Sequence, residues 1–101
     1  MTTAIPIDRN EVAAFCRRNH ISKLSVFGSV LGSDFGPSSD VDVLLEFEPG
    51  STTGFIGLHE IEQELSGLLG GHRVDLVTER FLNYRIRDRV LEAAEVQYAE
   101  R

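Results

Sequence analysis

Hydrophobic residues recur at helical spacing in two long segments of the chain. In residues 9–19 the apolar positions lie three or four apart, and Asp8 stands where the N-cap of a helix is expected. In residues 55–69 the same spacing separates an apolar side from a glutamate-rich side, and two glycines follow that can end a helix. The pattern therefore predicts two amphipathic helices here and a further helix over roughly residues 80–94.

Shorter segments show the period of an extended chain. Residues 23–27 alternate apolar and polar positions, residues 40–48 alternate and then become continuously apolar, and residues 73–78 form another short run. Residues 28–39 hold three glycines, four serines and a proline, which indicates a loop with room for one helical turn. A last small strand is expected at 96–98. This order predicts an α/β (α+β) fold, a small mixed sheet of three or four strands packed against about four helices.

The composition limits the class of protein and its partners. A length of 101 residues suits a single domain over residues 1–101, and 42% hydrophobic with 26% charged residues is ordinary for a globular chain. The formal charge of −6 repels polyanions, so we expect no direct binding to nucleic acid. A single cysteine, Cys16, suits a reducing compartment, and no apolar run is long enough for a membrane span. We therefore expect a cytoplasmic protein that does not enter the membrane.

Three aspartates lie in predicted strands. Asp40 and Asp42 are two apart, so in an extended chain their side chains project from the same face. Two neighbouring carboxylates repel each other, and a cation between them relieves that repulsion with the oxygen ligands that Mg²⁺ prefers. Asp75 lies between Val74 and Leu76, where a carboxylate suggests a functional cleft. If the two strands are neighbours, the three acids could hold two Mg²⁺ ions for phosphoryl transfer.

A phosphate-binding turn is predicted just after the first strand. Gly28 allows a close approach of the backbone, and Ser29 offers a hydroxyl and an amide to phosphate oxygens. The alternatives are plainer: solvated acids at the start of a strand for Asp40 and Asp42, an ordinary turn at Gly28 and Ser29, and a cap or a salt bridge to Arg73 for Asp75.

Other polar residues are assigned outside this site. His72 lies three residues before Asp75 and could face the cleft, but His20, His59 and His72 lack the spacing of metal ligands and are expected on the surface. Cys16 falls on the apolar side of the first helix and is expected in the core. Four arginines between positions 80 and 89 could contact triphosphate, RNA or an acidic partner, but interleaved acids equally favour a solvated helix face.

The motifs together resemble a known family. F-G-S at 27–29, S-D-V-D-V at 39–43 and V-D-L-V at 74–77 are similar to the polymerase-beta-like nucleotidyltransferases, in particular the minimal nucleotidyltransferases (MNT). Members pair with a helical HEPN-domain ribonuclease as antitoxin and toxin. The resemblance implies a polymerase-beta-like nucleotidyltransferase fold and an ATP-binding transferase that uses magnesium.

The resemblance also implies roles and an activity. Asp40 and Asp42 would bind two Mg²⁺ ions, Asp75 would complete the second metal site and assist catalysis, and Gly28 and Ser29 would bind phosphate. The implied function is an antitoxin that transfers AMP from ATP to a tyrosine of its toxin (AMPylation). The alternative is a catalytically weak or inactive antitoxin that neutralises the toxin by binding. Many relatives carry an arginine in the loop after Gly-Ser, and this chain has none there.

Overall fold

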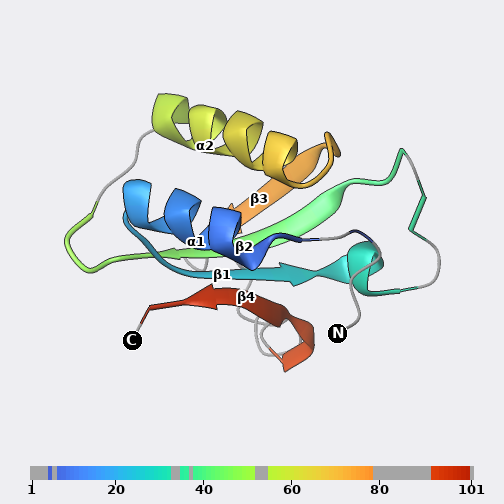
Figure 1. The fold of residues 1–101 in the computed structure, drawn as a ribbon, viewed down its shortest axis with the longest axis horizontal. Helices are drawn as coiled ribbons and strands as arrows, with labels where there is room; N and C mark the ends of the chain where they lie inside the picture. Colours follow the sequence, from blue (N-terminus) through green and yellow to red (C-terminus); the bar gives the residue numbers. More distant parts are fainter. Residues whose placement is uncertain are drawn as a thin grey trace.

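The fold is a mixed four-stranded sheet with two α-helices on one face. The computed structural model describes residues 5, 7–32, 35–36, 38–51, 55–78 and 92–100. In chain order (Figure 1) its elements are α1 (Arg9–Arg18), β1 (Ile21–Phe27), the 3-10 turn η1 (Gly28–Leu31), β2 (Val41–Phe47), α2 (Phe55–Leu68), β3 (Val74–Thr78) and β4 (Glu95–Ala99).

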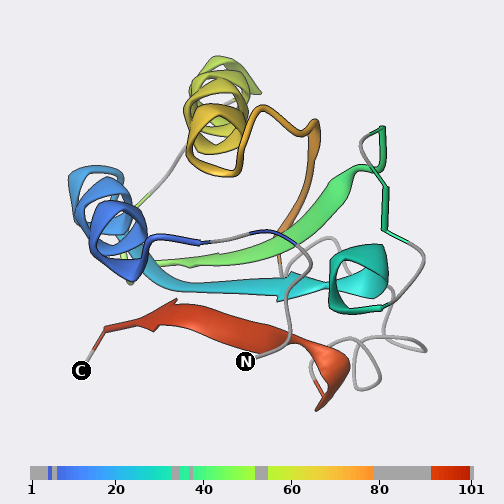
Figure 2. The same cartoon turned by 45° about the vertical axis from the view of Figure 1, so that its right-hand side comes forward.

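The order of strands in the sheet is β3-β2-β1-β4. β1 runs antiparallel to both β2 and β4, whereas β2 and β3 are parallel. Parallel neighbours need a crossover, and α2 supplies it by joining β2 to β3 on the side of the sheet where α1 also lies (Figure 2). Because β2 and β3 start at the same end of the sheet, the residues that begin these two strands lie next to each other.

Helix α1 begins and ends where its sequence indicates. The Asp8 carboxylate accepts hydrogen bonds from the backbone amides of Asn10 and Glu11, at 2.9 and 3.1 Å, and so caps the helix. Its apolar side is buried and includes Cys16, as predicted. Burial raises the pKa of the Cys16 thiol to about 12, against a smaller lowering by Arg17. The thiol is therefore uncharged at neutral pH and acts as a small apolar core group.

One buried cluster joins the two helices to the sheet. Alternate residues of β2 face the helices, which is why the valines on either side of Asp42 are fully buried and Asp42 is not. The cluster includes Phe15 of α1, Leu24 and Val26 of β1, Val41, Val43 and Leu45 of β2, and Ile61 and Leu65 of α2. This packing fixes which face of the sheet carries the helices and leaves the side chain of Asp42 on the opposite face.

Apart from the last helix, the predicted elements are confirmed with small shifts. The strand expected over residues 40–48 begins at Val41, because its ladder with β3 begins with the pair Val41 and Val74. The described residues contain two α-helices and one 3-10 turn, fewer than the four helices expected, and residues 80–91 of the predicted last helix lie outside them. The described helices include none that is long and apolar enough to cross a membrane.

Candidate functional site

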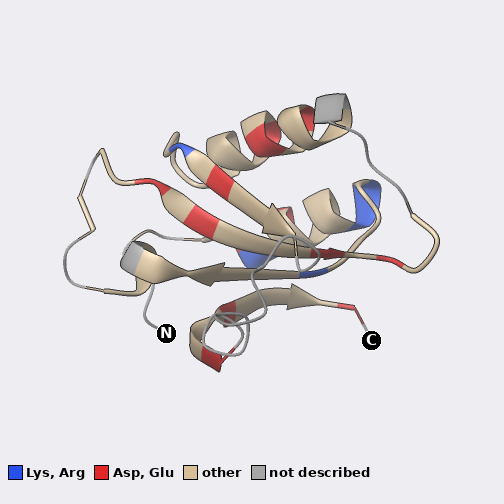
Figure 3. Ribbon diagram, turned by 180° about the vertical axis from the view of Figure 1, so that it is seen from behind, with Lys and Arg blue, Asp and Glu red and all other residues tan. Residues whose placement is uncertain are grey.

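Two of the predicted acids are direct neighbours in the sheet. Asp42 of β2 and Asp75 of β3 are paired in register in the parallel ladder. Residues paired in this way project from the same face, here the face opposite α1 and α2. Figure 3 shows acidic positions side by side on these two strands. The structure therefore places Asp42 and Asp75 on one face of the sheet, as predicted.

The electrostatics of Asp42 reflect this crowding. Its pKa is raised, first because the half-buried side chain loses solvation, then by the charges of Asp75 and Asp40 and by a side-chain hydrogen bond with Asp75. The charge of Asp40 therefore acts on the same group as that of Asp75. Ionisation of Asp42 therefore destabilises the folded protein, and a bound cation would remove this destabilisation.

This cost leads to a prediction for Asp42→Asn. An acid whose pKa is higher in the folded state destabilises that state once it ionises, so the cost is full at neutral pH and disappears below the ordinary aspartate pKa of about 4. In EDTA, urea unfolding should show Asp42→Asn to be more stable than the wild type at neutral pH, with a smaller gain at about pH 4.5. A gain that is the same at both values would mean that the repulsion is not its source.

Gly28 makes room for the Asp42 carboxylate. Its backbone φ is +76°, in the left-handed region that favours glycine, and it follows Phe27, the β1 partner of Asp42. A Cβ at position 28 would collide with Oδ2 of Asp42 and lie 3.2 Å from its Cγ. Ser29 is the second residue of η1, and the structure describes its backbone alone. The glycine of the predicted phosphate turn therefore touches the predicted metal site.

Asp40 lies outside the strand, contrary to the predicted strand start, but its backbone is fixed. The amide of Val41 donates to the carbonyl of Arg73 at 2.8 Å. On the other side, the carbonyl of Ser39 lies 3.1 Å from Nδ1 of His72. Asp40 itself is exposed, as is Asp75. The structure thus brings all three acids to the start of β2 and β3, with Asp42 the least exposed.

The donor set fits a hard divalent cation. All three groups are carboxylates, which are the ligands that Mg²⁺ prefers. Nevertheless, the described part of the chain contains no three His, Cys, Asp or Glu side chains that form a group able to hold a metal ion as they stand. Asp75 makes a side-chain hydrogen bond with Asp42, and the charge of Asp40 acts on the same carboxyl group. We therefore treat the three acids as a candidate metal site.

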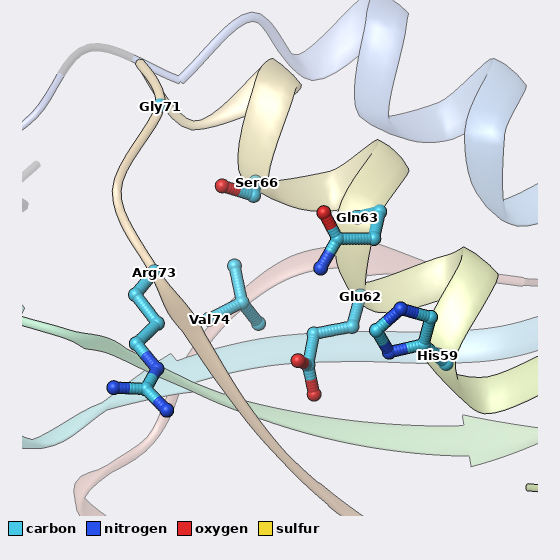
Figure 4. A pocket seen from close by; sticks show the side chains of 7 residues that line it. All are labelled: His59, Glu62, Gln63, Ser66, Gly71, Arg73 and Val74. Atoms are coloured by element: carbon cyan, nitrogen blue, oxygen red, sulfur yellow. The ribbon is translucent and has the colours of Figure 1, made fainter.

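An open depression of about 410 Å³ lies between α2 and the start of β3 (Figure 4). Its lining residues are His59, Glu62, Gln63, Ser66, Gly71, Arg73 and Val74. None of the three aspartates lines it. The Arg73 side chain extends away from α2, and the described residues show no ion pair between Arg73 and Asp75, the alternative considered from the sequence.

One residue was misplaced by the sequence analysis. His20 and His59 are exposed as predicted, whereas His72 is half-buried and its ring lies 4.8 Å from that of Phe35. Its position three residues before Asp75 was the sequence signal that His72 lies near the acids. The spacing of the histidines, however, does not reveal which group His72 contacts.

Comparison with known proteins agrees with these motifs. A family model described as "Nucleotidyltransferase domain" matches residues 9–96. A Methanocaldococcus jannaschii protein named "Putative protein adenylyltransferase" is 27% identical over 86 residues, 85% of this chain and 89% of that protein. A solved structure named as a "putative minimal nucleotidyltransferase" is 40% identical, with a TM-score of 0.69 over 85% of each chain.

A further likeness is to the complex of a tri-AMPylated Shewanella oneidensis HEPN toxin with an MNT antitoxin. One chain of that complex is 22% identical, with a TM-score of 0.59 over 90% of this chain and 69% of that one. At 22% identity, this match shows a similarity of fold alone.

Proposed function

Because this chain belongs to the nucleotidyltransferase domain family, we propose that it transfers AMP from ATP to a tyrosine of a HEPN-domain toxin and is the antitoxin of that pair. The observation that carries the proposal is the in-register pair Asp42 and Asp75, packed against Gly28 with Asp40 nearby. The name of the adenylyltransferase relative and the AMPylated toxin of the structurally similar complex support the choice of AMP and of the partner.

Each residue of the site has a part in this reaction. Asp40 and Asp42 would bind two Mg²⁺ ions, and Asp75 would complete the second site. Bound Mg²⁺ supplies charge neutralisation for the triphosphate and the leaving pyrophosphate. The turn at Gly28 and Ser29 would hold phosphate oxygens through its backbone. These roles require a protein that is most stable with the cation bound, which agrees with the raised pKa of Asp42.

Asp75 has a second task at the acceptor. It is an exposed carboxylate on the face of the sheet opposite α1 and α2, where a tyrosine of another protein can reach it. The tyrosine proton moves to the Asp75 carboxylate as the phenolic oxygen bonds to the α-phosphorus of ATP. The bond from that phosphorus to the oxygen bridging the β-phosphate breaks, and pyrophosphate leaves. Such proton transfer typically contributes about 10²–10⁴-fold to the rate.

Nucleotide binding tests the site without the toxin. In calorimetry, ATP should bind the wild type with Mg²⁺ present and bind far more weakly in EDTA. Asp42→Asn keeps the side-chain volume but removes a metal ligand, so it should lose most of the Mg²⁺-dependent binding. Glu60→Gln, an exposed α2 residue, is the matched control and should bind as the wild type does. Metal-independent binding that is unchanged in Asp42→Asn would exclude these acids as the site.

A second candidate function is neutralisation of the toxin by binding alone. The specific observation in its favour is the loop after Gly28, which lacks the arginine that many relatives carry. Under this alternative Asp75 would be dispensable for neutralisation and no AMP would be transferred.

A further inference from the structure

The segment that connects α2 to β3 holds the backbone on both sides of Asp40. The peptide group between Asp40 and Val41 bonds through its amide to the carbonyl of Arg73, at 2.8 Å. The peptide group between Ser39 and Asp40 bonds through its carbonyl to Nδ1 of His72, at 3.1 Å. The first of these hydrogen bonds joins two backbone groups, so it persists in every variant except one with proline in place of Val41. The second depends on one side chain.

His72 is itself fixed from two directions. Its carbonyl accepts a hydrogen bond of 2.6 Å from the Ser66 hydroxyl of α2, and its ring packs against Phe35 with 4.8 Å between the centroids. Because the Ser39 carbonyl can only accept a hydrogen bond, Nδ1 must carry the hydrogen and donate it. A continuous set of contacts therefore runs from α2 through His72 to the peptide that precedes Asp40.

We propose that His72 is a positioning residue that sets the direction of the Asp40 carboxylate toward the Asp42 and Asp75 pair. Asp40 precedes β2, so no strand pairing orients the Ser39–Asp40 peptide. Rotation of that peptide would swing the Asp40 side chain relative to β3. Groups that orient metal ligands through hydrogen bonds commonly change metal affinity by about 10–100-fold when removed. The inference rests on the proposed function, in which Asp40 is a metal ligand.

Two substitutions of similar size separate this role from general packing. In His72→Asn the amide nitrogen takes the place of Nδ1 and can still donate to the Ser39 carbonyl. In His72→Gln the amide nitrogen takes the place of Nε2, so the donor is displaced. Neither variant keeps the aromatic ring, and Phe35→Leu removes the ring contact from the other side as a control. Loss of packing alone would affect all three variants in the same way.

The experiment measures the Mg²⁺ concentration that gives half-maximal ATP binding by the full chain, together with urea unfolding of each variant. His72→Gln and His72→Ala should raise the Mg²⁺ midpoint about tenfold. His72→Asn and Phe35→Leu should stay near the wild-type midpoint, even where unfolding shows lost stability. Equal midpoints in wild type, His72→Gln and His72→Ala would overturn the inference, as would an equal rise in His72→Asn and His72→Gln.

Asp42→Asn, measured beside them, tells the two failures apart. If Asp42→Asn loses Mg²⁺-dependent binding while every His72 variant behaves as the wild type, the metal site stands and the role of His72 is wrong. If Asp42→Asn also binds Mg²⁺ and ATP as the wild type does, the proposed function fails, and the role of His72 fails with it.

Discussion

Replacing Gly28 with alanine should lower AMP transfer about 100-fold, because a misplacement of reacting groups by about 1 Å commonly has an effect of that size. The new Cβ would collide with Oδ2 of Asp42, so the carboxylate or the turn must move. The positive φ adds a conformational cost of about 1–2 kcal/mol to the folded state. Transfer is measured with labelled ATP and the cognate toxin as acceptor.

Gly50→Ala is the matched control for this prediction. Gly50 has a φ of +84°, and a Cβ there meets nothing within 4 Å. Gly50→Ala should therefore lose a similar amount of stability in urea unfolding and keep wild-type transfer. If both variants lost transfer equally, instability would explain the effect and the contact between Gly28 and Asp42 would have no special importance.

The second large effect is expected for Asp75→Asn. The substitution keeps the size of an exposed side chain and leaves the ladder between β2 and β3 intact, so the fold and the toxin complex should persist. Asp75→Asn removes both the proton acceptor and one metal ligand. The AMP transfer rate should therefore fall by about 10²–10⁴-fold or more. Rates are compared at equal occupancy of the toxin complex, which is determined by size-exclusion chromatography.

Glu60→Gln serves again as the control, since it removes one negative charge from an exposed position of α2. It should transfer AMP at the wild-type rate. An Asp75→Asn protein as active as Glu60→Gln would exclude Asp75 from catalysis, although Asp40 and Asp42 could still bind the nucleotide.

The sequence predicted the elements because local patterns determine them. The cap at Asp8, the apolar side of α2 and the period of two at Asp40 and Asp42 all depend on residues a few positions apart. The core position of Cys16 follows in the same way from helical spacing. Asp75 could be singled out because its neighbours are apolar, and the order of the motifs then indicated the family.

Contacts between distant residues could not be predicted in this way. Nothing local specifies that β3 pairs with β2 in the register that sets Asp75 beside Asp42, since this depends on where the α2 crossover ends. The contact between Gly28 and Asp42 joins residues fourteen apart in the sequence, the first in η1 and the second in β2. His72 was set aside for the same reason, because its partner, the Ser39 carbonyl, is a backbone group that no side-chain pattern reveals.

The intact mass of the HEPN toxin, after incubation with this protein, ATP and Mg²⁺, tests the central claim most directly. The account predicts one or more added AMP groups on a toxin tyrosine with the wild type. It predicts none in EDTA and none with Asp75→Asn within the same time. A toxin of unchanged mass that wild type and Asp75→Asn neutralise equally well would contradict AMP transfer, and the chain would then be an antitoxin that acts by binding.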